Sequence, residues 1–537
     1  MPRSRTLLVV YAGFLLLVVL WVRTRYGLES LPPGAQVAVD TVFRAGEVHA
    51  RRVGPVEEPV LPGAVRETIV GRARLPTHPV LLALSLAPLR DGVEAQLGDH
   101  RAVCTPEELK NAGAYDRALS SEEGPGVGVR VDILYALLGR SMGIKAHVVE
   151  RDATLFRARF APAPAPQPSR PTASAVRTSV REAAWHLARN VDGEGRYRYL
   201  VSAPSNQTLF GYNYARHAGA TLFLAQVAAT AGDADLTAPL LRAAAFLRER
   251  ASLRCGEHRC IAEGTEATMG ASAIATMAFA ELVRTGLDAS YLPALRELTA
   301  FLRSMQRPDG EFQHVYDVAA KAPVNVQYMY FTGEASLALA LAYEVTGDAR
   351  DLHAASRALG HLVAHGWSFP LSAYYQNEEH WTCQAMAQLW RHAPNPEALS
   401  FCLRWNEFQR AVQYVGGAPD PSWLGGYGVG TVMLPRLTPA ASRSEATAAT
   451  LAILLSDKGH VNAEQAQALR AQLDLAVSFL LRQQITAEGA ASYRDALAVQ
   501  GAFPGSAADL DLRIDYAQHA GAALLRWLAL EGSGNNL

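Results

Sequence analysis

The chain has 537 residues, of which 49% are hydrophobic and 19% charged, with 50 basic against 51 acidic side chains. This composition is that of a globular chain with a large buried core, and it argues against disorder. A net charge near zero argues against a nucleic-acid-binding protein, which normally carries a basic domain or stripe. The sequence has no Walker-type or dinucleotide-type glycine loop, so nucleotide chemistry is not favoured.

Residues 6–22 form an uncharged apolar run of 17 residues near the N-terminus. This length is at the lower limit for a membrane-spanning helix, and no small-residue cleavage site follows it. We therefore expect residues 1–26 to be an uncleaved, single-pass signal anchor; the alternative is a cleaved signal peptide. Arginines flank the run on both sides, so the positive-inside rule does not decide its orientation. The short N-terminal tail is easiest to keep in the cytoplasm. We therefore expect an inner-membrane protein whose bulk is exocytoplasmic or periplasmic.

The five cysteines are too few for a disulfide scaffold. Cys255 and Cys260 enclose Gly-Glu-His-Arg, a spacing that suits a local disulfide or two metal ligands joined by His258. For an exported protein the disulfide is favoured. Cys104, Cys383 and Cys402 are an odd remainder, so we expect at least one free, buried thiol.

Residues 27–160 are predicted to form a small α+β domain without an evident catalytic pattern. Alternating apolar residues predict strands, and the Thr105-Pro106 start signal predicts a helix. The Pro/Ala-rich residues 161–174 are a stiff linker that marks the domain boundary. The predicted elements are strands at 37–43, 67–73 and 145–150, a buried strand or short helix at 81–87, and helices opening at Thr105 and spanning 131–142.

Residues 175–537 are predicted to be helical and repetitive. Several helices end in a similar aromatic-Leu phrase, whose leucines are separated by 60, 55, 60 and 118 residues. The last gap is two periods long, and a degenerate unit at 401–412 fits within it. The result is six helical hairpins of about 60 residues each. The leucines of this phrase are Leu187, Leu247, Leu302, Leu362 and Leu480.

The other helix of each hairpin carries small residues, which permit the close packing that an inner ring needs. The chain phrase Tyr214–Leu222 reappears with two changes at Tyr516–Leu524, each time at the start of such a helix. Three units also contain an acid-Gly-aromatic turn, at Asp192, Asp309 and Glu488. The predicted inner helices begin at Tyr214, Met269, Phe331, His380, Ser444 and Tyr516.

Six helical hairpins of this length resemble the (α/α)6 toroid of six-hairpin glycosidases, polysaccharide lyases and sugar epimerases. Gln306–Phe312 also resembles the Q-x-x-D-G-x-aromatic turn of terpenoid cyclases and protein prenyltransferases, another toroid group. The resemblance is architectural and covers residues 175–537. An α-solenoid is the alternative, but its repeats are about 34 to 47 residues long and lack the long second loops. We therefore expect a mainly α fold, an (α/α)6 toroid preceded by the anchor and the α+β domain.

In such a ring, polar residues at the inner-helix starts are expected to point into a central funnel. Carboxylates, imidazoles and aromatic rings from different hairpins would suit a sugar, because aromatic faces stack on it and polar groups bind its hydroxyls. Glycoside hydrolysis uses two carboxyl groups, for which Glu334 with Glu379 (or Glu378) is the preferred pair. A lyase or epimerase would instead use a Tyr or His, with Arg216 neutralising a substrate carboxylate. The candidate catalytic residues are Glu334, Glu379, His380 and Tyr330; the candidate substrate-binding residues are Arg216, His217, Tyr212, Asn213, Glu378, Trp381, Trp423, Tyr427, Tyr516 and His519.

Structural explanations compete with several of these assignments. Glu334 lies in a first helical turn, where the helix dipole alone favours an acid. His217 and His519 occupy equivalent units and could each bond a neighbouring loop carbonyl. The polar, aromatic segment Glu378–Trp381 is harder to explain by packing. No metal or cofactor site is expected, because the zinc pattern of prenyltransferases and the aspartate-rich runs of terpene cyclases are missing.

The sequence thus predicts a membrane-anchored, exocytoplasmic carbohydrate-active protein that acts by hydrolysis, elimination or epimerisation. This prediction depends on fold analogy together with the polar and aromatic helix starts. The alternative from another class is a non-catalytic envelope protein whose toroid binds a glycan or a protein. A prenyltransferase-like or terpene-cyclase-like enzyme is less favoured.

Overall fold

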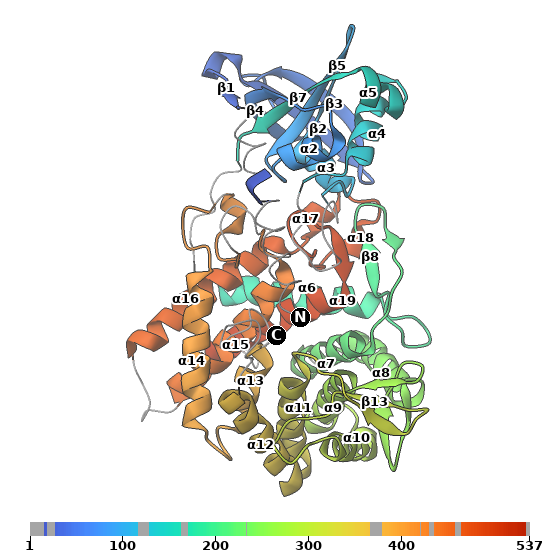
Figure 1. Cartoon of the computed structure of the whole chain (residues 1–537), viewed down its shortest axis with the longest axis vertical. Helices are drawn as coiled ribbons and strands as arrows, with labels where there is room; N and C mark the ends of the chain where they lie inside the picture. Colours follow the sequence, from blue (N-terminus) through green and yellow to red (C-terminus); the bar gives the residue numbers. More distant parts are fainter. Residues whose placement is uncertain are drawn as a thin grey trace.

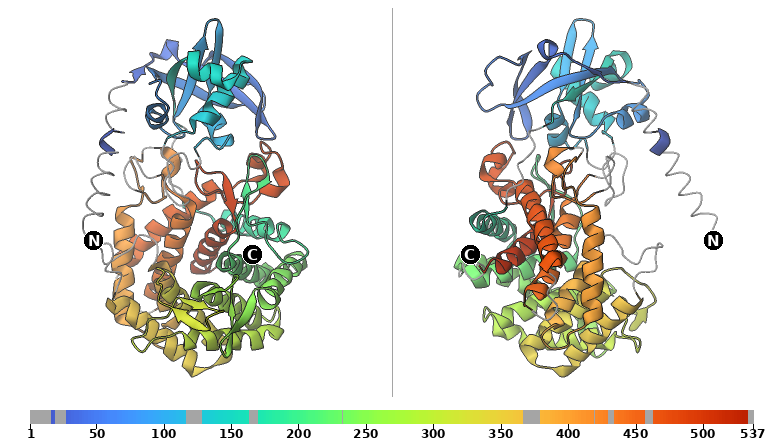
Figure 2. Two further views of the ribbon diagram at one scale, coloured as in Figure 1. Left: turned by 45° about the vertical axis from the view of Figure 1, so that its right-hand side comes forward. Right: turned by 90° about the vertical axis from the view of Figure 1, so that its left-hand side faces the viewer.

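The computed structural model describes residues 16–18, 27–115, 128–162, 170–231, 233–365, 379–418, 420–428, 434–456 and 463–532. An N-terminal region with a sheet lies above a larger helical body, which it covers on one side in every view (Figures 1 and 2). The predicted anchor at 6–22 lies outside the described residues apart from 16–18. Over the described ranges, no helix is long and apolar enough to cross a bilayer.

The N-terminal region is built on one antiparallel sheet with the strand order β3-β2-β4-β7-β5-β6, to which β1 adds by pairing with β4. The strands predicted at 37–43 and 67–73 are confirmed as β2 and β4, and they pair with each other. The strands are β1 (Glu29–Ser30), β2 (Val37–Arg44), β3 (Glu47–Pro55), β4 (Val65–Arg74), β5 (Asp91–Leu97), β6 (His100–Cys104) and β7 (Thr154–Phe160).

Four helices accompany the sheet: α2 (Pro79–Ser85), α3 (Pro106–Asn111), α4 (Val131–Met142) and α5 (Ala146–Asp152). The Thr105 hydroxyl caps α3 by accepting a bond from the Glu108 N–H at 3.2 Å, and Gly143 ends α4 with φ 72°. The strand predicted at 145–150 is wrong, because those residues begin α5. Only Val149 of α5 is buried, so a short one-sided helix looked like an alternating strand.

The helical body has an inner ring in which each helix contacts the next and α19 returns to α7. The predicted starts at Tyr214, Met269 and Phe331 are confirmed, but the fifth helix begins at Leu437 and not at Ser444. The inner helices are α7 (Tyr214–Ala231), α9 (Met269–Arg284), α11 (Phe331–Thr346), α13 (Glu379–Leu389), α15 (Leu437–Ser456) and α19 (Ile514–Leu530).

An outer layer of helices surrounds this ring, and the predicted phrase lies in the C-terminal half of each outer helix. The degenerate unit predicted at 401–412 falls in α14, where Trp405 is fully buried. The outer helices are α6 (Ala173–Arg189), α8 (Ala234–Glu249), α10 (Leu292–Ser304), α12 (Ala349–His365), α14 (Pro396–Ala411) and α16 (Ala463–Gln483). One hydrophobic core runs through both layers.

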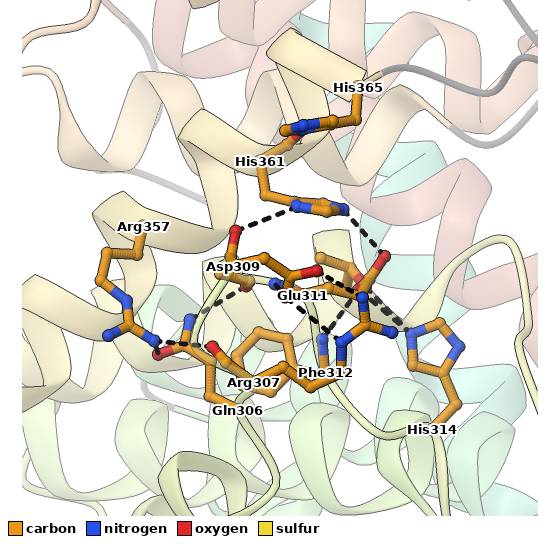
Figure 3. Close-up of polar contacts among 11 residues, drawn as sticks. Gln306, Arg307, Asp309, Glu311, Phe312, His314, Arg357, His361 and His365 are labelled. Carbon is orange, nitrogen blue, oxygen red and sulfur yellow. Dashed lines mark hydrogen bonds and ion pairs between the residues drawn. The ribbon is translucent and has the colours of Figure 1, made fainter. Parts of the chain in front are cut away.

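Three glutamine tethers connect successive hairpins. In each, one side-chain amide donates to the carbonyl of a turn glycine with positive φ and to a carbonyl of the next outer helix; Figure 3 shows the one at Gln306. A Cβ on any of these glycines would come within 2.6 Å of a backbone oxygen of that next helix. The tethers are Gln306 to Gly310 and Ala354, Gln413 to Gly425 and Gln472, and Gln484 to Gly501 and Ser179, at 2.9–3.1 Å. The turn predicted at Glu488-Gly489 is wrong: those residues lie in α17 (Ala487–Ala490).

The structure pairs four of the five cysteines. The predicted Cys255–Cys260 disulfide joins the adjacent strands β10 (Ser252–Cys255) and β11 (His258–Ile261). A second disulfide, Cys383–Cys402, links α13 to α14 and was not predicted, because 19 residues separate its cysteines. Cys104 is free and buried, as expected for the odd thiol.

Candidate functional site

A cavity of about 650 Å³ occupies the lumen of the inner ring and is lined by residues of every inner helix. It extends from the N-terminal part of α7, α13 and α19 toward the C-terminal ends of the inner helices, whereas the sequence predicted a funnel at their N-terminal ends. The cavity is open because many of the side chains that face the lumen are small; longer side chains at these positions would fill it. They are Gly219, Ala387, Ala448, Ala449, Ala452, Ala522 and Ala529.

The inner end of the cavity holds an acid paired with an imidazole. Glu445 of α15 is 2% exposed, and its carboxylate lies 2.7 Å from Nδ1 of His519 on α19. The His519 ring lies 5.8 Å from the His380 ring and 6.0 Å from the Trp381 ring, measured between centroids. Trp381 and Glu445 both line the cavity. The structure therefore brings together three of the predicted residues, His380, Trp381 and His519, around an acid that was not predicted.

Glu334 is a buried acid on the lumen side of α11. It lies seven residues, or two helical turns, before Leu341, which lines the cavity. Its Oε2 atom is packed over Gly270 of α9, where a Cβ would come within 2.5 Å of it, and it has no hydrogen-bond partner among the described residues. Burial raises the pKa of Glu334 to about 8. At neutral pH this carboxyl group is therefore protonated and able to donate a proton.

The raised pKa of Glu334 predicts a pH-dependent loss of stability. An ordinary glutamate titrates near 4.5, so between pH 4.5 and 8 the folded chain holds a proton that the unfolded chain releases. Stability falls with rising pH across this window, by up to about 1.4 kcal/mol per pH unit. The substitution Glu334→Gln keeps the shape of the side chain but replaces the carboxyl group by an amide, which does not ionise. In urea unfolding it should match the wild type at pH 4 and exceed its stability by a few kcal/mol at pH 8.5; equal stabilities at both pH values would contradict the assignment.

Arg216, Asp515 and Arg513 form a buried ionic network at the N-terminal ends of α7 and α19. Arg513 contacts the Asp515 carboxylate at 2.6 Å, and Arg216 approaches it at 3.5 Å. Burial alone would raise the pKa of Asp515, but the two guanidinium charges outweigh it and lower the pKa to about 2. Tyr516 lies under the Arg513 guanidinium at 4.7 Å, and Arg216 also donates to the Tyr199 hydroxyl at 2.8 Å. Arg216 and Tyr516 thus have partners within the protein that account for their positions.

His217, Tyr212 and Asn213 are engaged in local structure. The buried His217 ring donates through Nε2 to the Ala243 carbonyl at 2.9 Å and accepts from the Tyr212 hydroxyl at 2.7 Å. Burial lowers the pKa of His217 to about 4, so the ring is neutral, in keeping with this bonding. The Asn213 side chain accepts from the Arg216 N–H at 2.9 Å at the start of α7. His217 thus has a structural role, although its carbonyl partner lies in α8 and not in a loop as expected.

The remaining predicted residues lie away from the Glu445–His519 pair or outside the described structure. Trp423 packs in the core of the N-terminal region, and Tyr427 is buried between the Gln472 amide and the Arg443 guanidinium. Tyr330 directly precedes α11. Glu378 and the side chain of Glu379 lie outside the described residues, so the predicted Glu334–Glu379 separation has no measured value.

A second histidine cluster surrounds Glu311, beside the Gln306 tether (Figure 3). His361 lies 3.2 Å from its carboxylate and His314 lies 3.5 Å away, and Thr332 donates to it. Burial would raise the pKa of Glu311, but the bonds from His314 and Thr332 lower it to about 2. Every partner in this cluster belongs to the protein, so the cluster joins the turn to α12. Over the described chain, no group of three or more His, Cys, Asp or Glu side chains is arranged to hold a metal ion.

The sequence reasoning missed Glu445, Gln384 and Arg526, all of which line the cavity. The misplaced start of α15 put Glu445 in a first helical turn, where an acid is unremarkable, whereas the true start at Leu437 places it two turns inside the ring. A charged residue in the interior of an Ala-rich inner helix was the available signal.

Comparison with solved structures identifies the fold. D-mannose isomerase matches with a TM-score of 0.53 at 12% identity, over 67% of this chain and 100% of that one. The helical body is an (α/α)6 toroid. An unsaturated glucuronyl hydrolase specific for heparin (TM-score 0.49, 11% identity, 68% and 100% covered) and a GH76 α-mannanase from Bacteroides thetaiotaomicron (0.48, 10%, 67% and 95%) are also similar. TM-scores below 0.5 support no argument from these two.

The likeness to D-mannose isomerase at 12% identity shows the fold alone. No protein-family model matches the chain, and no curated protein matches it. The toroid thus confirms the predicted architecture, and any statement about chemistry depends on the lumen residues described above.

Proposed function

We propose that this protein is an enzyme that acts on a carbohydrate in the toroid lumen by proton transfer. The observation that carries the proposal is the paired Glu445 and His519 beside the Trp381 indole, on a cavity whose volume lies within the roughly 300–1,000 Å³ typical of small-molecule sites. The indole offers a face for a sugar ring, and the acid–imidazole pair offers a proton acceptor. That the fold is shared with an enzyme named for D-mannose is consistent with this proposal.

Glu334 and Glu445 have environments that suit opposite roles. Glu334 is buried, its Oε2 atom has no hydrogen-bond partner in the described part of the chain, and it holds its proton to about pH 8, so it suits a general acid. Glu445 is hydrogen-bonded to His519, which suits a general base or a group that orients the imidazole. Pairs of titratable groups with such unlike environments divide the acid and base roles at many active sites. Hydrolysis, elimination and epimerisation each need this division.

The proposal is tested by incubating the purified chain with a panel of neutral and acidic mono- and oligosaccharides. Three assays separate the reactions: new reducing ends for hydrolysis, ultraviolet absorbance of new double bonds for elimination, and deuterium uptake from D₂O for epimerisation or isomerisation. We expect one of the three signals with at least one sugar. Binding of a glycan without any of these signals would instead support the non-catalytic alternative.

We further propose that the protein is held in the membrane by residues 6–22 with its bulk outside the cytoplasm. The support is the apolar run of 17 residues together with the two disulfides, which persist in oxidising compartments. Cell fractionation with a carbonate wash and protease treatment of spheroplasts tests this. Recovery in the soluble cytoplasmic fraction would contradict it.

A further inference from the structure

The carboxylates that line the described cavity each lie against a basic side chain of the protein. Because each has a partner, none is left to receive a positively charged ligand. The pairs are Glu281 with Arg284, Glu344 with His392 and Glu445 with His519, each at 2.7 Å.

Arg526, in contrast, enters the same cavity without a close ion pair to a carboxylate among the described residues, although the Glu445 charge acts on it from a distance. It extends from α19 across the lumen to α13, where it donates to the amide oxygen of Gln384. Burial lowers the pKa of Arg526, and the Glu445 charge offsets only part of this effect. Arg391, an exposed residue just after α13, also lines the cavity and makes no ion pair within the described chain. Arg526 and Arg391 therefore line the lumen without a close ion pair to a carboxylate in the described part of the chain.

Gln384 adds an unsatisfied donor at the same point. Its side chain is 2% exposed, and its oxygen is taken by Arg526. The Nε2 amide group has no acceptor in the described part of the chain. A buried donor without an acceptor costs roughly 1–3 kcal/mol, so a ligand oxygen bound here would recover part of that cost.

The rest of the cavity wall suits the body of a sugar. The Trp381 indole and apolar side chains surround the space between Arg526 and Glu445, with glutamines among them. A planar guanidinium binds a carboxylate or a phosphate through two parallel hydrogen bonds, which fixes the orientation of the ligand. The apolar lining consists mainly of Leu222, Phe223, Met277, Leu337, Leu341 and Leu525.

We propose that the lumen takes an anionic carbohydrate, with Arg526 and Gln384 binding its carboxylate or phosphate group. This inference rests on the proposed function in taking the ligand to be a sugar. It adds the substrate class, and it assigns specificity to two residues that the proton transfer itself does not use.

The test is isothermal titration calorimetry of the full chain with matched sugars. The probes are glucuronate, galacturonate and mannuronate, the 6-phosphates of the corresponding hexoses, and the neutral hexoses themselves. We expect one anionic series to bind at least ten-fold more tightly than its neutral counterpart. Tighter binding of the uronates would identify the carboxylate as the recognised group. Tighter binding of the sugar phosphates would identify the phosphate.

Variants then locate the preference. Arg526→Gln should lose at least ten-fold in affinity for the preferred anion and leave neutral sugars unchanged, while Arg526→Lys should keep part of the preference. If Arg526→Gln has a lower melting temperature than the wild type, Arg391→Gln is the second variant to be tested. Arg181→Gln removes the same charge from an exposed site on α6 and should change nothing.

Equal affinity for anionic and neutral sugars, or an Arg526→Gln variant with an intact preference, would overturn the inference. This failure is distinct from failure of the proposed function. If the anionic preference is found but no sugar is turned over, only the enzymatic proposal fails. If a neutral sugar is turned over without any anionic preference, only the inference fails.

Discussion

Glu445→Gln should lower turnover of the substrate found in the carbohydrate screen by roughly 10²- to 10⁴-fold, the range typical of a lost general acid or base. The amide keeps the shape of the side chain, and its oxygen can still accept from His519 Nδ1, which lies 2.7 Å from the carboxylate in the wild type. The substitution therefore removes the negative charge with little change in packing. Initial rates at saturating substrate, with melting temperatures recorded in parallel, provide the measurement.

A matched control comes from the other end of the cavity. Glu344 also lines the lumen and is also paired with an imidazole, that of His392 at 2.7 Å, but it lies near the C-terminal end of α11. Glu344→Gln should keep the rate within about two-fold, because no proton transfer is assigned to it. If Glu445→Gln retains more than a tenth of the wild-type rate, or if both variants lose activity equally, Glu445 has no special role.

Gly425→Ala should be among the most destabilising single substitutions in the toroid, at roughly 2–5 kcal/mol. Gly425 has φ 87°, which costs a non-glycine residue roughly 1–2 kcal/mol. The added Cβ would also lie 2.0 Å from the Leu475 carbonyl of α16, a backbone atom that cannot turn aside. Overpacking of this kind adds roughly 1–3 kcal/mol. Urea-unfolding midpoints of the variant and the wild type measure the loss.

Gly347→Ala separates the two causes. Gly347 ends α11 with φ 66°, but nothing lies within 4 Å of the position its Cβ would take. This variant should therefore lose only the backbone penalty, about 1–2 kcal/mol. Should the two variants prove equally stable, the steric contact between the Gly425 turn and α16 would be unimportant.

The toroid could be predicted from the sequence because buried side chains recur once in each hairpin. The aromatic-Leu phrase marks where each outer helix meets the core, and Leu187, Leu247, Leu302 and Leu480 are fully buried. The sheet of the N-terminal region was predicted only in part, since strands such as β3 are largely exposed and other pairing partners are far apart in sequence. The tethers at Gln413 and Gln484 could not be predicted from the sequence for a related reason. Their turn glycines lie 12 and 17 residues on, not four as after Gln306.

The site was harder to predict than the fold. His380, Trp381 and His519 were found because aromatic and imidazole side chains stand out at the starts of Ala-rich helices. Glu445 and Arg526 were not found, because their role depends on which residues face them across the lumen. Helix periodicity gives the face of a residue on its own helix, but the register between helices far apart in sequence comes only from packing.

The Gln484 tether reaches Ser179 of α6, so the last hairpin is bound to the first one by the same bond that joins its neighbours. Arg170 meets Glu531 at 2.7 Å at this junction, and α19 packs against both α6 and α7. An open solenoid needs special capping repeats at its two ends, whereas this ring has no ends to cap. The contact between the last and the first hairpin is thus of the same kind as the contacts between other neighbouring hairpins. Circular permutants of the toroid, opened at another hairpin and joined across residues 170 and 531, should reach the same closed structure.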